Sequence, residues 1–154
     1  MARKVSARVL RIGLNLWPPF IGAGIRVRRI ASDFREVQVD MSFGIRNRNY
    51  FGTQFGGSLY AMTDPFFVLM VHHNLPRGYM VWDKAGSIEY VAPGRGPVSA
   101  TIRLEQGDID TILRMTADGD KHLHFFNVDV VDREGLTVAK VEKIVYARKK
   151  AEQA

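Results

Sequence analysis

Residues 55–73 read FGGSLYAMTDPFFVLMVHH, and this stretch decides the fold. Apolar residues recur through it at helical spacing: Leu59, Met62, Phe66 and either Leu69 or Met70. The opposite side of the same helix is also rather apolar, so other elements have to cover most of its surface. The sequence therefore predicts a central helix enclosed by the rest of the chain.

Asp64-Pro65 interrupts this helix near its middle. Proline removes one helical hydrogen bond and crowds the preceding turn, at a cost of roughly 3 kcal/mol in a continuous helix. We therefore expect a break or kink beside Asp64.

The segments around the helix alternate apolar and polar residues, which is typical of strands with one buried face. We expect strands at about residues 25–43, 81–91, 98–105, 122–131 and 136–148. Two more helices are expected, one over residues 5–16 that ends at Pro18-Pro19, and a short one with Asp108 as its N-cap and Gly119 as its stop.

An antiparallel sheet and one long apolar helix bury their apolar surfaces best when the sheet curls around the helix. The predicted class is therefore α+β, a hotdog fold with an extra N-terminal helix. With 154 residues, 46% of them hydrophobic, the chain suits a single domain over residues 1–154. We expect residues 1–20 to form its N-terminal helix and proline-rich turn, and residues 148–154 to form a basic tail.

Composition narrows the partners and the compartment. The chain has no cysteine, which excludes disulfides and thiolate sites, and the cytoplasm is the expected location. It has no continuous apolar run that suits a signal core or a membrane-spanning helix, so no membrane insertion is expected. The net charge of +6 favours an anionic partner, whether nucleic acid, a membrane surface or a phosphorylated small molecule. Because no nucleic-acid-binding motif accompanies the scattered basic residues, nucleic acid is not the expected partner.

The run from Asn49 through Gly52-Thr53 and Gly56-Gly57 to Asp64 resembles the active-site signature of hotdog acyl-CoA thioesterases of the phenylacetate-pathway type. The chain also resembles a domain-of-unknown-function subgroup of that superfamily in three further segments: Leu14–Phe20, Tyr90–Pro93 and Val141–Tyr146. The resemblance implies thioester hydrolysis, with the Gly56 amide as oxyanion donor, Asn49 positioning substrate and water, and Asp64 as the catalytic carboxylate.

Helix geometry limits how these residues cooperate. Gly56 and Gly57 open a helix whose first N–H groups have no intrahelical acceptor, so they suit the oxyanion role. Asp64 follows Gly56 by eight residues, about 12 Å along a continuous helix at 1.5 Å per residue. One thioester carbonyl cannot contact both groups. A site that uses both needs a second chain, which predicts a twofold dimer, alone or paired into a tetramer.

Each assignment has a structural alternative. Asp64 before Pro65 is also the pattern of an N-cap that restarts a broken helix. Gly56 and Gly57 also suit close helix packing, and Asn49 lies in a turn-rich segment.

The expected substrate-binding residues include two departures from the thioesterase pattern. Phe55 stands where many of those enzymes carry histidine, and it suits the wall of an acyl pocket. Asp83 and Lys84 fall near the position that often holds serine or threonine, where they would orient water or pair with the carboxylate. Three arginines, Arg46, Arg48 and Arg95, are candidates for contacts with the phosphates of CoA.

The leading hypothesis is acyl-CoA hydrolysis, with CoA as part of the substrate and no separate cofactor. Its rival is a module of the same fold that binds or senses acyl-thioesters, which Phe55 and Pro65 favour. A hydratase lacks the expected histidine beside the helix, and no serine elbow is present. His122 and His124 share a strand face, but no third ligand stands at readable spacing, so no metal is expected.

Overall fold

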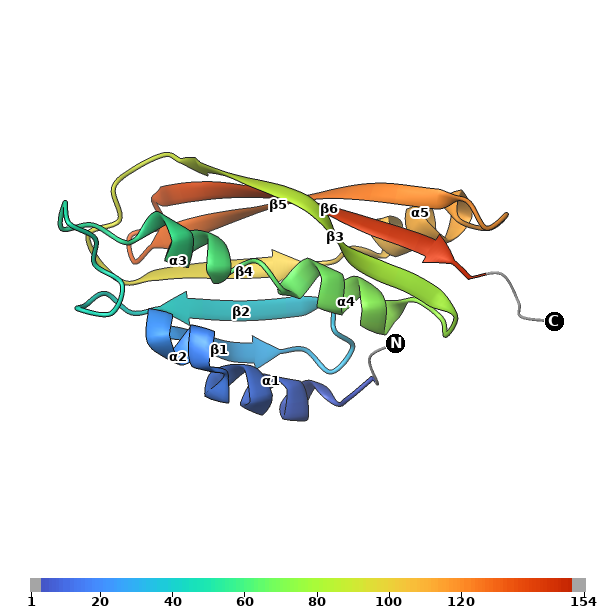
Figure 1. The fold of residues 1–154 in the computed structure, drawn as a ribbon, viewed down its shortest axis with the longest axis horizontal. Coiled ribbons are helices and arrows are strands. Elements are labelled where there is room, and N and C mark those ends of the chain that lie inside the picture. The colour runs from blue at the N-terminus through green and yellow to red at the C-terminus, as the bar shows by residue number, and fades with distance from the viewer. Residues whose placement is uncertain (1–3, 151–154) are drawn as a thin grey trace.

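Six antiparallel strands form one curved sheet in the computed structural model, which describes residues 4–150. Their order across the sheet is β1-β2-β4-β5-β6-β3 (Figure 1). The strands are β1 (Ile25–Ile30), β2 (Glu36–Met41), β3 (Tyr79–Tyr90), β4 (Val98–Arg103), β5 (Lys121–Asp132) and β6 (Thr137–Lys149). The two edges of the sheet are therefore β1 and β3.

Five helices accompany the sheet in the described part of the chain: α1 (Ala7–Leu16), α2 (Pro18–Ala23), α3 (Gly56–Ala61), α4 (Phe66–Asn74) and α5 (Gln106–Met115). The ribbon shows α3 and α4 end to end across one face of the sheet, while α1 and α2 lie along the β1 side (Figure 1). None of the described helices is long and apolar enough to cross a membrane.

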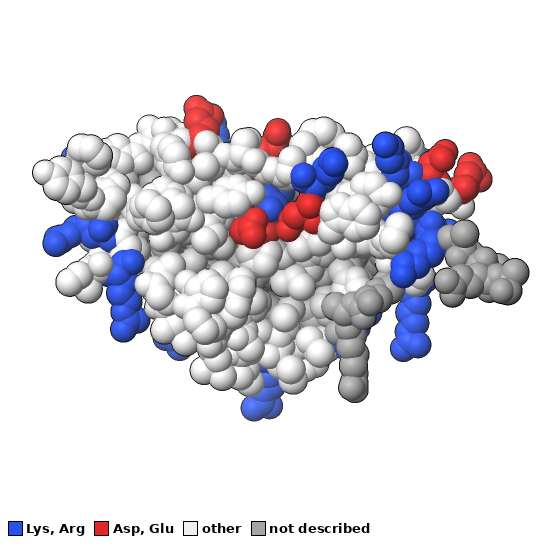
Figure 2. All heavy atoms as spheres, viewed as in Figure 1, with Lys and Arg blue, Asp and Glu red and all other residues white. Residues whose placement is uncertain are grey.

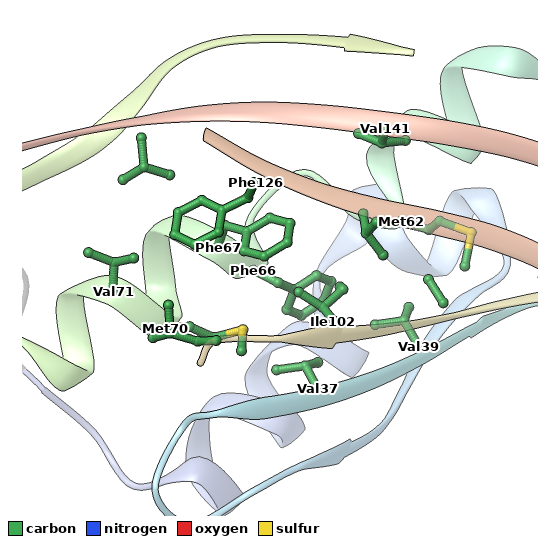
Figure 3. Packing of buried hydrophobic residues seen from close by; sticks show 14 of the residues in the cluster. Val37, Val39, Met62, Phe66, Phe67, Met70, Val71, Ile102, Phe126 and Val141 are labelled. Atoms are coloured by element: carbon green, nitrogen blue, oxygen red, sulfur yellow. The ribbon is translucent and has the colours of Figure 1, made fainter. Parts of the chain in front are cut away.

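The core fills the space between α4 and the curled sheet (Figure 3). Phe67 of α4 stacks on Phe126 of β5, with ring centroids 4.4 Å apart. Phe66 and Met70 point to the side of Val37 and Ile102, and all four are at most 1% exposed. This confirms the α+β hotdog architecture, with the sheet wrapped around the central helix.

The strand expected over residues 25–43 is wrong, because this segment folds into the β1–β2 hairpin. Its turn is built by Asp33, whose carboxylate accepts the Arg35 N–H, and by Phe34, whose φ of +57° is left-handed. The Arg28-Arg29 pair already breaks the alternation, and the β1–β2 register shifts there. Polar turn residues inside an otherwise strand-like run were the sequence signal for two strands.

The expected break in the central helix is present. α3 ends at Ala61, with Met62 as its C-cap, and α4 restarts at Phe66 after Pro65. Pro65 itself has helical backbone angles and stands at the N-cap position, so the two segments continue in the same general direction. The Asp64 side chain lies at this junction.

Other boundaries also differ from expectation. The proline-rich turn expected after the first helix is wrong, because Pro18 is the first residue of α2, a position that suits proline. Asp108 is not the N-cap of α5: Glu105 holds that position, and Asp108 lies one turn later, where its carboxylate accepts the Glu105 N–H. The two acidic residues form a reciprocal capping box, which binds two N–H groups instead of one. Of the expected basic tail, Arg148 and Lys149 belong to β6, and residues 151–154 lie outside the described residues.

The two sheet edges are treated differently. Asn15 of α1 donates to the Val27 carbonyl (3.0 Å) and accepts the Val27 N–H (2.8 Å), so α1 covers the backbone edge of β1. β3 pairs with β6 along one side, and its residues from Lys84 to Ser87 are exposed. An uncovered edge strand is a template for pairing with another chain.

Replacing Asn15 with alanine removes both hydrogen bonds to Val27 and leaves that edge unpaired. We expect a loss of about 1–2 kcal/mol in the free energy of unfolding, measured by urea denaturation. Arg8→Ala, an exposed change on the same helix, is the matched control and is expected to have no measurable effect. Equal stability of the two variants would contradict the role given to Asn15.

Candidate functional site

A pocket of about 490 Å³ is bordered by the Asn49 to Gly57 segment, which carries the resemblance to thioesterases. One wall runs from Asn49 and Thr53 to Leu59, and the other wall comes from the last residue of β3, Tyr90, and from residues 91–94 that follow it. The pocket lining includes three predicted catalytic residues, Asn49, Gly56 and Gly57, together with Phe55. The structure therefore brings these four residues together.

Gly56 and Gly57 are the first two residues of α3, and Phe55 is the N-cap, without a side-chain hydrogen bond to the helix. The N–H groups of Ser58 and Leu59 both donate to the Phe55 carbonyl. The two glycines precede these donors and line the pocket. Because α3 has only six residues, its dipole adds little, and the N–H groups themselves are the useful donors.

Each glycine lies against an aromatic ring. A Cβ at Gly56 would lie 2.5 Å from the Tyr90 hydroxyl, and one at Gly57 would lie 2.6 Å from the Phe55 ring. The alternative role of the two glycines, close packing, is therefore present in the structure. The groups that pack on them are the rings of Tyr90 and Phe55 in the pocket wall, which are 57% and 56% exposed. The same missing side chains leave room for a ligand if either ring moves.

Asn49 organises its own loop. Its side-chain oxygen accepts the N–H groups of Phe51 and Thr53, and its amide donates to the Thr53 hydroxyl and the Gln54 carbonyl. The turn alternative is therefore correct as a description of its contacts. The substrate-positioning role of Asn49 stays a prediction.

Gln54 holds the pocket wall to its surroundings. Its side chain is buried, and its amide donates to the Ser42 carbonyl beyond β2 and to the Gly96 carbonyl before β4, each at 3.0 Å. Its backbone N–H donates to Gly94 at 2.8 Å. This one residue therefore ties the segment between β2 and α3 to the loop between β3 and β4.

Asp64 is held by a lysine. Lys143 of β6 donates to its carboxylate at 2.6 Å, and the lysine side chain is 2% exposed whereas that of Asp64 is 46% exposed. α4 has no side-chain cap, so the N-cap alternative for Asp64 is wrong. Figure 2 shows acidic side chains at the surface near the middle of this face. The Asp64 carboxylate is therefore held by a buried lysine and is still open to solvent.

The Lys143 ammonium lies among three oxygen-bearing side chains. It donates to the Tyr60 hydroxyl at 3.2 Å and lies 3.2 Å from the Asp83 carboxylate. Gly86 of β3 makes room for this cluster, because a Cβ there would overlap the Tyr60 hydroxyl and crowd the lysine stem. Burial alone would lower the pKa of Lys143, but hydrogen bonds to Asp64 and Tyr60 and the two carboxylate charges outweigh it and raise the pKa.

Asp83 reaches the same cluster from β3. Burial raises its pKa above the ordinary value, and the charge of Asp64 adds to this, against the opposing effect of Lys143. The residue after it, Lys84, occupies a β-bulge, since Asp83 pairs with Val145 while Ala85 pairs with Ile144. Bulges redirect side chains beside functional sites. The structure thus brings Asp83 to Asp64 and leaves Lys84 exposed.

A second hollow, of about 330 Å³ and mostly apolar, lies between α4 and β3. Val68, Leu69 and Trp82 contribute to its lining, and Trp82 is the neighbour of Asp83 in sequence. Asp64 does not line the first pocket, so within one chain the predicted carboxylate and the predicted oxyanion donors are in separate places.

Two of the three predicted CoA-binding arginines, Arg48 and Arg95, lie near the first pocket, whereas Arg46 is turned toward α2. Arg48 and Arg95 are exposed and adjoin the lining residues Asn49 and Gly94 in sequence. Arg46 reaches the Ile21 carbonyl at 3.3 Å. Their contact with phosphate stays a prediction.

The two histidines that share a face of β5 contact each other and the carboxylate of Asp108. His122 and His124 lie 3.2 Å apart by ring nitrogens, and His124 lies 3.1 Å from the Asp108 carboxylate. Burial lowers the pKa of His122, and the nearby His124 lowers it further. Across residues 4–150 no group of three or more histidine or acidic side chains is arranged to hold a metal ion.

Sequence reasoning missed Lys143, Tyr60 and Tyr90 as site residues. Lys143 had a readable signal, because it shares the inward register of β6 with Val141, Val145 and Ala147, where a charge is costly without partners. Tyr90 had no such signal in the sequence, because its approach to Gly56 depends on the path of β3.

Solved structures share this fold over nearly the whole chain. A probable thioesterase of unknown function from Pseudomonas aeruginosa is 16% identical, with a TM-score of 0.81 over 94% of this chain and 97% of that one. A thioesterase from Haemophilus influenzae is 15% identical, with a TM-score of 0.68 over 98% and 96%. A mutant of the phenylacetic acid degradation protein PaaI from Thermus thermophilus is 23% identical, with a TM-score of 0.58 over 84% and 98%. These matches confirm the hotdog fold.

No curated protein matches the sequence significantly. The family model described as "Domain of unknown function (DUF4442)" matches residues 6–146, which is most of the chain and includes both pocket walls, Asp64 and Lys143. The resemblance to a domain-of-unknown-function subgroup is thereby confirmed, and the chain belongs to the DUF4442 family.

Proposed function

We propose that this protein hydrolyses acyl-thioesters, with acyl-CoA as the expected substrate, at a site built by two copies of the chain. The observation that carries the proposal is the Asp64–Lys143 pair. A lysine that is 2% exposed holds a carboxylate that is 46% exposed, at the break of the central helix. Burying a cation is costly, and the arrangement is useful if the carboxylate must keep one orientation toward a substrate.

The chemistry follows from this orientation. Asp64 takes a proton from water, the oxygen of that water bonds to the thioester carbonyl carbon, and the negative charge on the carbonyl oxygen is bound by backbone N–H groups. The carbon–sulfur bond then breaks, and the leaving thiolate takes up the proton from Asp64. The products are a carboxylic acid and a free thiol. Gly56 and Gly57 supply the N–H groups, and Tyr90 stands beside them as a further donor.

A shared site resolves the separation between Asp64 and Gly56. β1 is covered by α1, whereas β3 presents an open edge next to Asp83. Antiparallel pairing of two β3 edges would give a twofold dimer. In that dimer Asp64 of one copy would meet the glycine pair of the other. Pairing of two such dimers into a tetramer stays a prediction.

The two hollows suit the two parts of an acyl-CoA. The apolar hollow lined by Val68, Leu69 and Trp82 suits the acyl group. The pocket of the glycine pair has Arg48 and Arg95 near its rim for the CoA phosphates. The cytoplasm, where acyl-CoA is formed and used, is the expected compartment.

The rival function is binding of acyl-thioesters without cleavage. It is favoured by Phe55, whose ring packs on Gly57 and offers no hydrogen bond to a substrate carbonyl. The two functions share the pocket and differ only in whether Asp64 acts on the substrate.

Asp64→Asn separates them. We expect thiol release from a panel of acyl-CoAs to fall at least 100-fold, because the amide cannot accept the proton, while acyl-CoA binding measured by calorimetry changes little. Asp110→Asn, an exposed change on α5, is the matched control. Binding by the unaltered protein without thiol release at any chain length would establish the rival function instead.

Mixing two inactive variants tests the shared site. Asp64→Asn lacks the base, and Gly56→Val fills the space beside Tyr90, so each alone is expected to be inactive. Random exchange makes half of the dimers mixed, and each mixed dimer keeps one intact site, so about a quarter of the full activity should return. A mixture as inactive as its components would place both groups in one chain's own site.

Lys143→Met tests the contribution of the buried ammonium group, which pairs with both Asp64 and Asp83. Without the ammonium, the pKa of Asp83 loses its lowering influences and rises further, so ionising Asp83 opposes folding. We expect the variant to be about 1–3 kcal/mol less stable than the original protein at pH 7. A raised carboxyl pKa stabilises the fold at low pH and loses that effect as pH rises through the folded value, so the deficit should shrink toward pH 4. Urea denaturation at several pH values measures it, and a deficit independent of pH would refute this account.

A further inference from the structure

The positive charge of the chain is concentrated at one end. Its first 32 residues contain seven basic residues and no acidic one: Arg3, Lys4, Arg8, Arg11, Arg26, Arg28 and Arg29. The remaining residues carry 15 basic against 16 acidic side chains. The net charge of +6 therefore belongs to the segment that forms α1, α2 and β1, and the rest of the chain is close to neutral.

The same segment exposes an apolar surface, which we name the α1–α2 face. Val9, Ile12 and Leu16 share one side of α1 and are 58%, 46% and 68% exposed. Trp17 and Ile21 continue this surface into α2, at 46% and 45% exposed. The other side of α1 carries the contacts with the domain, through Leu14 against the core and Asn15 on β1. α1 thus carries a second apolar side, which is turned away from the protein.

Basic groups stand next to the α1–α2 face. Arg8 on α1 and Arg26 on β1 are exposed. The Arg46 guanidinium donates to the Ile21 carbonyl of α2. By contrast, Arg28 and Arg29 are paired with Asp40 and Glu36. In Figure 2 no acidic side chain is visible over the lower part of the molecule, where α1 and α2 lie, and basic ones project from it.

We propose that the α1–α2 face binds the surface of a membrane that contains anionic lipid. An apolar strip with basic residues beside it, on a helix that lies flat, is the pattern of helices that rest in the lipid headgroup region. A tryptophan at its end suits that region too, because its ring is apolar and its N–H is polar. The helix is already folded and clamped to β1, so binding requires little further ordering.

Charge argues against a second copy of the chain as the occupant. Two α1–α2 faces would bring like charges together without an acidic side chain from either segment to offset them. The face also lies at the β1 edge, at the opposite side of the sheet from the open β3 edge. It therefore stays available in the proposed dimer, and this inference does not depend on the proposed enzymatic activity.

Sedimentation with lipid vesicles tests the inference on the full-length protein. We expect binding to vesicles of phosphatidylcholine with about one-third phosphatidylglycerol, weak binding to phosphatidylcholine alone, and a loss of binding as salt is raised. In a Trp82→Phe background, the emission of Trp17 should shift to shorter wavelength when anionic vesicles are added. Equal binding to both vesicle types, or no binding to either, would overturn the proposal.

Paired variants locate the contact. Leu16→Ser and Arg8→Glu should each weaken vesicle binding by about fivefold or more, because one removes apolar contact and the other a favourable charge. Leu136→Ser and Arg133→Glu, in the exposed β5–β6 turn, are the matched controls and should leave binding unchanged. If the controls weaken binding equally, the face is not the contact. If Leu16→Ser instead changes the molecular mass in solution, the face is a protein interface and the proposal is wrong.

Discussion

The ammonium group of Lys143 has to find its partners inside the domain, because its side chain is almost wholly enclosed. This constraint connects parts of the fold that are otherwise unrelated. Asp64 comes from the break between α3 and α4, Asp83 from an edge strand, and Tyr60 from the end of α3. A continuous central helix would not present Asp64 in the same way, so the proline after it and the lysine below it belong to one arrangement. Gly86 completes it by leaving space for the lysine stem.

Much of the fold was predictable because its signals are local. The apolar stretch that became α3 and α4, the alternation of the later strands and the break at Pro65 all depend on near neighbours in sequence. The missed hairpin at residues 31–35 shows the limit of this reasoning. There the apolar alternation on either side outweighed the turn residues Ser32 and Asp33, although the chain reverses at that point.

The site was predictable only in part, for a physical reason. The glycine pair and Asp64 form a pattern along the chain, whereas the contacts that give them surroundings come from β3 and β6, which are far away in sequence. The position of Lys143 in an apolar register pointed to a buried charge but not to its partner. Asn49 shows the reverse case, since a residue that fits a catalytic pattern is engaged in its own turn.

Gln54 has a consequence for how the pocket responds to a ligand. Its buried amide joins the end of β2 to the loop before β4, and its backbone joins the same loop to the start of α3. The frame of the pocket is thus held by hydrogen bonds that exist before any ligand arrives. Little backbone entropy remains to be lost on binding, and the exposed rings of Phe55 and Tyr90 are the parts left to adjust. For the proposed acyl-thioester ligand, this frame favours selection by rotation of side chains, on the fast timescale of rotamer exchange, over the slower closure of a loop.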